Sequence, residues 1–144
     1  MSRGYAAVGL YRPKTRVNVA SALRACGCYG VAMLACEGQR YKQHSADTMK
    51  AFRRIPFIQA PLKQQVPYDC VPVAVELVDQ AVDLRTYKHP QRAFYVFGPE
   101  DGTLGRNVLS WCRDVVQIPT NGCMNLAASV NVVLYDRLLK EKLG

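Results

Sequence analysis

Side chains that could do chemistry gather in two loops in the last third of the chain. Residues 97–102 have the sequence Phe-Gly-Pro-Glu-Asp-Gly, and residues 118–126 run from Ile-Pro to Cys-Met-Asn-Leu. Each loop follows an apolar run, and α/β proteins bind small molecules at the carboxyl ends of their parallel strands. The backbone N–H and C=O groups of two such loops could hold an adenine or a ribose. We therefore expect a ligand pocket between them.

The first of these loops matches neither common phosphate-binding motif. Its glycines Gly98 and Gly102 stand four residues apart, whereas the dinucleotide fingerprint begins with two glycines that are two apart, and no Gly-Lys-Ser/Thr is present. Glu100 and Asp101 would repel phosphates, but they could meet a ribose, an ammonium group or a basic partner. An ordinary turn is the alternative, because Gly and Pro are common in turns.

Asn18, Arg24 and Asn125 each have two interpretations. The two asparagines stand at the starts of expected helices, where Asn is a common cap, but they could instead belong to a site. Arg24 lies off the apolar stripe of its helix, as either a surface arginine or a catalytic group would. Neither His44 nor His89 has the motif context of a general base, and no Ser–His–Asp or Cys–His arrangement stands out. A hydrolase is therefore the weaker enzyme class.

The elements that must position these residues alternate between strands and helices. Apolar runs predict buried strands at residues 6–11, 30–36, 72–77, 93–97 and 115–118. Helices are expected from about residue 18 to 26, with Gly27 as the stop, and over 104–112 and 126–143. Residues 39–54 are polar and basic, with weak helical signals. The pattern predicts an α/β fold, a mostly parallel sheet with helices on both faces, as a single domain over residues 1–144.

The final helix has more apolar surface than one sheet needs. One expected stripe is buried, and it consists of Leu126, Val130, Val133, Leu134 and Leu138. A second stripe consists of Val132, Tyr135 and Leu139. We expect the second stripe to meet another subunit in a homodimer. The alternative is a helix buried within its own monomer.

The six cysteines stand in apolar segments, which is typical of buried thiols in a reducing compartment. Cys26 and Cys28 form a C-x-C pair, but no second close pair accompanies them, so we expect no metal. No apolar run approaches the length of a membrane helix, and the start of the chain has no secretory pattern. We expect a soluble, cytoplasmic protein.

The net charge of +8 is concentrated in the first half of the sequence. Residues 1–63 hold eleven Lys or Arg and two acids, whereas residues 64–144 hold eight Lys or Arg and nine acids. Such asymmetry favours a basic face that binds a phosphate backbone, with strong salt dependence. A solvated basic surface is the alternative.

Three segments together resemble the motifs of a known family. Asn18 is followed six residues later by Arg24, the second motif is residues 97–100, and the third runs from Ile118-Pro119 through Cys123 to Val130. In order and spacing they resemble the SpoU/TrmH branch of the SPOUT methyltransferases, the α/β-knot RNA 2′-O-ribose methylases. The resemblance covers nearly the whole chain. It implies a C-terminal deep trefoil knot, S-adenosyl-L-methionine as cofactor, and a homodimer whose active site lies near the subunit interface.

The resemblance also implies roles for individual residues. Arg24 would act at the ribose 2′-hydroxyl, with Asn18 in support. The implied cofactor-binding residues are Val75, Gly98, Glu100, Ile118, Cys123, Met124 and Asn125. Cys123 departs from the pattern, because the family commonly has Ser there and a thiol is the weaker hydrogen-bond donor.

No separate RNA-binding extension is expected, so the basic residues of the first half would hold the RNA. They include Arg12, Lys14, Arg16, Arg40, Lys42, Arg53 and Arg54. A compact substrate such as a tRNA loop suits this arrangement. The sequence thus predicts an S-adenosyl-L-methionine-dependent RNA 2′-O-ribose methyltransferase that acts on tRNA. A non-catalytic knot-fold RNA-binding protein, and methylation of rRNA or of a base, stay open as alternatives.

Overall fold

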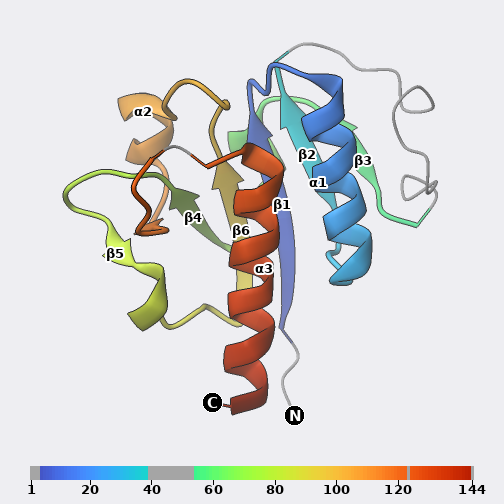
Figure 1. The fold of residues 1–144 in the computed structure, drawn as a ribbon. Coiled ribbons are helices and arrows are strands. Elements are labelled where there is room, and N and C mark those ends of the chain that lie inside the picture. The colour runs from blue at the N-terminus through green and yellow to red at the C-terminus, as the bar shows by residue number, and fades with distance from the viewer. Residues whose placement is uncertain (1–3, 39–53, 123, 144) are drawn as a thin grey trace.

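The computed structural model describes residues 4–38, 54–122 and 124–143, and within them the chain forms one seven-stranded sheet (Figure 1). Every neighbouring pair of strands is parallel, and the order across the sheet is β3-β2-β1-β6-β4-β7-β5. The strands are β1 (Tyr5–Tyr11), β2 (Leu34–Glu37), β3 (Phe57–Gln59), β4 (Val71–Val75), β5 (Val82–Asp83), β6 (Arg92–Phe97) and β7 (Asp114–Gln117). The predicted α/β class is confirmed. The C-terminal trefoil knot stays a prediction.

The two central strands, β1 and β6, are buried on both faces, which explains why their sequences are continuous apolar runs. Successive side chains point to opposite faces. Val8, Leu10 and Tyr95 belong to the core on one face, and Ala7 and Phe94 belong to the core on the other.

Helices cover both faces of the sheet, as the alternation of elements predicts. Helices α1 (Arg16–Cys28) and α3 (Leu126–Leu143) lie side by side on the first face (Figure 1). Helix α2 (Gly105–Ser110) and the short 3-10 turn η3 (Leu62–Gln65) pack against the second face, and another such turn, η4 (Leu84–Thr86), packs on the first. None of the described helices has the length and apolarity that a membrane span requires.

Helix α1 begins and ends differently from the prediction. Its N-cap is Thr15, whose Oγ1 accepts a hydrogen bond from the Asn18 backbone N–H at 3.2 Å, so the expectation that Asn18 opens the helix is wrong. Gly27 does not stop the helix, which continues to Cys28. The left-handed residue beyond its end is Gly30, with φ of 66°, the conformation that commonly terminates helices.

The second strand also begins later than predicted, at Leu34 instead of Gly30. The residues before Leu34 connect the end of α1 to the sheet. The Val31 N–H donates to the Cys26 carbonyl of α1, and the Ala32 N–H donates to the Ala6 carbonyl of β1. Strands β3 and β5 were not predicted, since three and two residues are too few for a periodic signal. The weak helical signal at 39–54 falls almost wholly outside the described residues.

Helix α3 spans the predicted residues, but its buried stripe differs near the C-terminus. Leu126, Val130, Val133 and Leu134 are buried as expected, whereas Leu138 is 40% exposed, so its assignment to the buried stripe is wrong. Arg137 takes the inward position instead. Its guanidinium donates to the backbone carbonyls of Pro90 and Gln91 and to the Tyr95 hydroxyl, at 2.6–3.0 Å, which satisfies the buried charge.

Candidate active site and cofactor pocket

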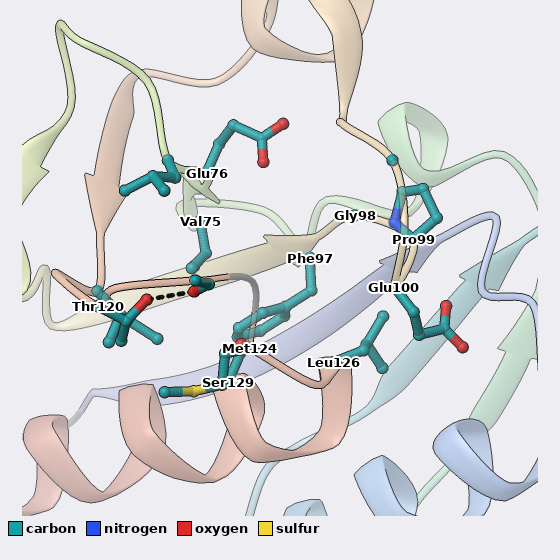
Figure 2. Close-up of a pocket in the computed structure, with 14 residues that line it drawn as sticks. Val75, Glu76, Phe97, Gly98, Pro99, Glu100, Thr120, Met124, Leu126 and Ser129 are labelled. Atoms are coloured by element: carbon teal, nitrogen blue, oxygen red, sulfur yellow. Dashed lines mark hydrogen bonds between the residues drawn. The ribbon is translucent and has the colours of Figure 1, made fainter.

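The carboxyl ends of β6, β4 and β7 are adjacent in the sheet, and the loops that follow them enclose a pocket (Figure 2). The start of α3 closes it on the side of the first face. The lining residues are Val75, Glu76, Leu77, Phe97, Gly98, Pro99, Glu100, Gly102, Ile118, Thr120, Gly122, Met124, Leu126 and Ser129. The pocket therefore lies where the sequence predicts one, between the loop at 97–102 and the segment at 118–126.

Five of the seven predicted cofactor residues line this pocket: Val75, Gly98, Glu100, Ile118 and Met124. Asn125 does not line it, although it lies between two residues that do. Cys123 falls outside the described residues.

Several lining residues were not predicted from the sequence, and one of them, Glu76, is charged. Glu76 directly follows strand β4, and its Oε1 accepts a hydrogen bond from the Leu104 backbone N–H at 2.8 Å. The predicted strand at 72–77 included Glu76, whereas β4 ends at Val75, so the sequence did not mark Glu76 as a residue at a strand end. The apolar lining residues Phe97 and Leu126 belong to the ends of predicted elements and carried no separate signal.

A chain of hydrogen bonds joins the three motif segments beside the pocket. The Asn18 Nδ2 donates to Glu100 Oε2 at 2.6 Å, and the Asn125 Nδ2 donates to Asn18 Oδ1 at 2.9 Å. Asn125 Oδ1 in turn accepts from the backbone N–H groups of Ala127 and Ala128, which fixes the orientation of both amides. Asn125 therefore both caps α3 and takes part in this chain of hydrogen bonds, whereas Asn18 takes part in the chain only, because Thr15 is the cap of α1.

Glu100 is held as an ionised hydrogen-bond acceptor. Burial raises the pKa of its carboxyl, but hydrogen bonds from the Asn18 side chain and from the Lys14 and Thr15 backbone outweigh that effect, so the pKa lies below its ordinary value. Glu100 is thus suited to hold α1 against the loop after β6. It is unsuited to give up a proton at neutral pH.

Arg24 lies on the exposed side of α1 and does not line the pocket. It shares one face of the helix with Val17, Ser21 and Cys28, which are also exposed. Its guanidinium forms no salt bridge with any residue that the structure describes. A single chain therefore brings Asn18, Glu100 and Asn125 together but leaves Arg24 outside this group.

Of the predicted RNA-binding residues, Arg12, Lys14, Arg16 and Arg54 are described, and all four are exposed. Arg40, Lys42 and Arg53 fall outside the described residues. The Lys14 Nζ lies 2.9 Å from the Asp101 carboxylate, so the basic partner of the loop at 97–102 comes from this set. The basic segment before α1 thereby contacts the rim of the pocket.

The five cysteines that the structure describes give no sign of a shared site. Burial raises the pKa of Cys26, Cys36 and Cys112 to about 12, which keeps these thiols protonated. Cys28 is exposed, so the expectation of a buried thiol is wrong there, and the two members of the C-x-C pair have different surroundings. Among the described residues, no three His, Cys, Asp or Glu lie close enough together to hold a metal ion.

Comparison with solved structures identifies the same fold. The SpoU methyltransferase AviRb from Streptomyces viridochromogenes is 18% identical with a TM-score of 0.85, and the match covers 99% of this chain and 62% of that one. An AdoMet-bound rRNA methyltransferase from Sinorhizobium meliloti is 21% identical with a TM-score of 0.84, covering 95% and 57%. A third structure is described as giving insights into the 2-OH methylation of C/U34 on tRNA. It is 18% identical with a TM-score of 0.82, and the match covers 99% of this chain and 94% of that one.

The chain spans about three-fifths of the length of the first two structures. No significant sequence match to a curated protein was found. The model of the SpoU rRNA Methylase family matches residues 5–135. Since that match takes in all seven strands and the segments that surround the pocket, the chain belongs to the SpoU rRNA methylase family.

Proposed function

We propose that the protein is an S-adenosyl-L-methionine-dependent RNA 2′-O-ribose methyltransferase that acts on tRNA. The observation that carries the proposal is the Glu100–Asn18–Asn125 chain of hydrogen bonds, which ties three distant segments together at the edge of one pocket. Family membership supports RNA methylation. The structure concerned with 2-OH methylation on tRNA, which this chain matches over nearly its full length, supports the ribose and tRNA assignments.

The residues that line the pocket fit S-adenosyl-L-methionine. Val75, Ile118, Met124 and Leu126 provide apolar walls for an adenine, and the turns at 98–102 and 118–122 present backbone groups at the ends of strands. The lining of the described part contains no cationic side chain that would oppose a positively charged ligand. When bound, the cofactor supplies a methyl group on a sulfonium, which carries its own leaving group.

The protein must orient the ribose and withdraw the proton of its 2′-hydroxyl. We assign Arg24 to this step, where its cationic side chain either helps the 2′-hydroxyl to lose its proton or holds the neighbouring phosphate. Asn18, Glu100 and Asn125 position the segments on which the reacting groups are aligned. Alignment of the oxygen, the methyl carbon and the sulfur would supply much of the rate.

Because Arg24 lies outside the pocket of its own chain, we further propose a homodimer that completes the site. Val132, Tyr135 and Leu139 are 36%, 55% and 42% exposed, an apolar stripe along α3 that lines a groove with Ile118 and Pro119. Ile118 also lines the cofactor pocket. Association through this stripe would therefore occur next to the bound cofactor, where Arg24 of α1 is needed.

The decisive experiment is methyl transfer from labelled S-adenosyl-L-methionine to total tRNA, followed by nucleoside analysis. A 2′-O-methylated nucleoside is the expected product. Arg24→Ala should reduce transfer at least a hundredfold while calorimetric cofactor binding persists, and Arg106→Ala, an exposed arginine on α2, should behave as the wild type.

Other results would replace parts of the proposal. A methylated base, or transfer to rRNA alone, would change the substrate assignment. RNA binding without cofactor binding would identify a non-catalytic RNA-binding protein. Normal transfer by Arg24→Ala would refute the role of Arg24.

A further inference from the structure

The cofactor pocket has a one-sided charge. Among the described residues that line it, the only side chains that carry a charge at neutral pH are Glu76 and Glu100, and both are acids. Lys14, in the segment before α1, directs its ammonium group to Asp101, which does not line the pocket. A positively charged group inside the pocket therefore meets carboxylates and no opposing cation from the described lining.

The two carboxylates differ in the number of hydrogen bonds that their oxygens accept. Glu100 Oε1 accepts from the Lys14 N–H at 3.1 Å, and Oε2 accepts from Asn18 and Thr15. Glu76 uses Oε1 for the Leu104 N–H at 2.8 Å, and its Oε2 has no hydrogen-bond partner among the described residues. Figure 2 places the two side chains on opposite sides of the pocket, Glu76 at the end of β4 and Glu100 towards α1. The negative charge of Glu76 is thus the less neutralised of the two.

We propose that Glu76 is a specificity-determining residue that makes the pocket prefer the positively charged methyl donor over the neutral-sulfur product. The inference rests on the proposed function. S-adenosyl-L-methionine and S-adenosyl-L-homocysteine differ by one methyl group and by the positive charge on sulfur. A carboxylate at the pocket wall attracts only the first of these sulfur centres. At the effective dielectric constant of about 20 that suits charges near a protein surface, an attraction of this kind amounts to roughly a tenfold difference in affinity.

Such a preference has a direct use in turnover. Methyl transfer discharges the sulfonium, so the attraction from Glu76 disappears at the moment the product forms. The product then leaves a pocket that no longer favours it, and a fresh methyl donor competes well against accumulated product.

The hydrogen bond from Leu104 offers a second role that must be separated from the first. Through it, Glu76 connects the end of β4 to the residue before α2, and so steadies the loop at 98–104. Glu76→Gln keeps an oxygen acceptor of the same shape but removes the charge. Glu76→Ala removes both. Asp79→Asn, an exposed acid three residues later that does not line the pocket, is the matched control for loss of one negative charge.

The test is calorimetric titration of the full chain with S-adenosyl-L-methionine, S-adenosyl-L-homocysteine and sinefungin, whose amine places a positive charge near the sulfur position. Glu76→Gln should weaken S-adenosyl-L-methionine and sinefungin about tenfold and S-adenosyl-L-homocysteine less than twofold. Asp79→Asn should change none of them. Glu76→Ala should weaken all three, because the loop is no longer held.

Equal weakening of all three ligands by Glu76→Gln, or no weakening, overturns the inference and leaves the proposed function intact. Binding of none of the three by the wild type overturns the proposed function, and the inference with it. If Glu76→Gln folds poorly, Glu76→Asp, which keeps the charge on a shorter side chain, must retain the preference for the charged ligands.

Discussion

The side-chain amide of Asn125, at the cap of α3, donates a 2.9 Å hydrogen bond to the side-chain oxygen of Asn18 in α1, 107 positions earlier in the sequence. The same Asn18 side chain donates to Glu100 in the loop after β6. One amide therefore links both helices of the first face to the edge of the pocket. A substitution at any one of these three residues should therefore alter the hydrogen bonding of the other two.

Asn125→Asp and Asn125→Ala should separate the cap from the link. The aspartate keeps oxygens for the N–H groups of Ala127 and Ala128 and suits a helix N-terminus, so we expect a free energy of unfolding close to that of the wild type. It loses the donor to Asn18, so cofactor affinity should fall. Asn125→Ala should lose affinity and also about 1 kcal/mol of stability. Urea unfolding and calorimetry check both, and equal destabilisation by the two variants would contradict the assignment.

Glu100 should make the free energy of unfolding depend on pH in the acid range. Its pKa is held below the ordinary value of 4.5 in the folded chain, so its contribution is present above about 4.5 and is lost as the pH falls through the folded pKa. Asn18→Ala removes one of the hydrogen bonds that lower this pKa. We expect the variant to lose less stability than the wild type over this acid range, as measured by urea unfolding at a series of pH values. Asn107→Ala, which removes an exposed amide of α2 that has no hydrogen bond to Glu100 in the described structure, serves for comparison.

His89 should add a second pH dependence nearer neutrality. Its ring nitrogens lie 2.7 Å from the Tyr95 hydroxyl and 2.7 Å from the Asp136 carboxylate, and its side chain is 5% exposed. Burial lowers its pKa below 6.5, and the hydrogen bond from the ring to the Asp136 carboxylate offsets this only in part. The unfolded chain therefore takes up the proton more readily, so stability is present above about pH 6.5 and declines below it.

This expectation is checked by following the His89 imidazole by NMR and the free energy of unfolding between about pH 7 and 5. His89→Gln should be less stable at pH 7 and should show a flatter pH profile. Titration of the His89 ring above 6.5 would show that the contact with Asp136 dominates instead.

The exposed stripe of α3 should control the oligomeric state. Tyr135→Glu or Leu139→Glu places a charge in the apolar groove and should weaken dimer formation by at least a hundredfold, with a shift to monomer in light scattering. Asn107→Glu, on the exposed side of α2, introduces the same charge on the other face of the sheet and should leave the dimer intact. A monomeric wild type would refute the proposed dimer.

The sequence predicted the central strands and α3 well because buried parallel strands and long helices leave strong apolar patterns. The role of Asn18 could not be predicted in the same way. Thr15 and Asn18 are both good capping residues, and the contact that decides between them comes from Glu100, 82 positions away. Motif resemblance pointed to Asn18, but local pattern alone did not.

The inward position of Arg137 could not be predicted from the sequence for a different reason. Charged residues are seldom buried, so an apolar stripe through Leu138 is the natural expectation for α3. The carbonyls of Pro90 and Gln91 and the Tyr95 hydroxyl make the buried arginine acceptable, and all three come from the β6 region. Glu76 shows a third limit, since the strand predicted over 72–77 includes it, whereas β4 ends at Val75 and leaves Glu76 at the strand end.

Ile118 belongs to two cavities at once, the pocket at the strand ends and the groove beneath the exposed stripe of α3. A shared wall of this kind makes two binding equilibria interdependent. If cofactor binding moves Ile118 to a position that strengthens dimer association by some factor, dimer association must raise the cofactor affinity by the same factor, because thermodynamic coupling is reciprocal. Cofactor affinity would then vary with protein concentration, and a dilute sample would underestimate it.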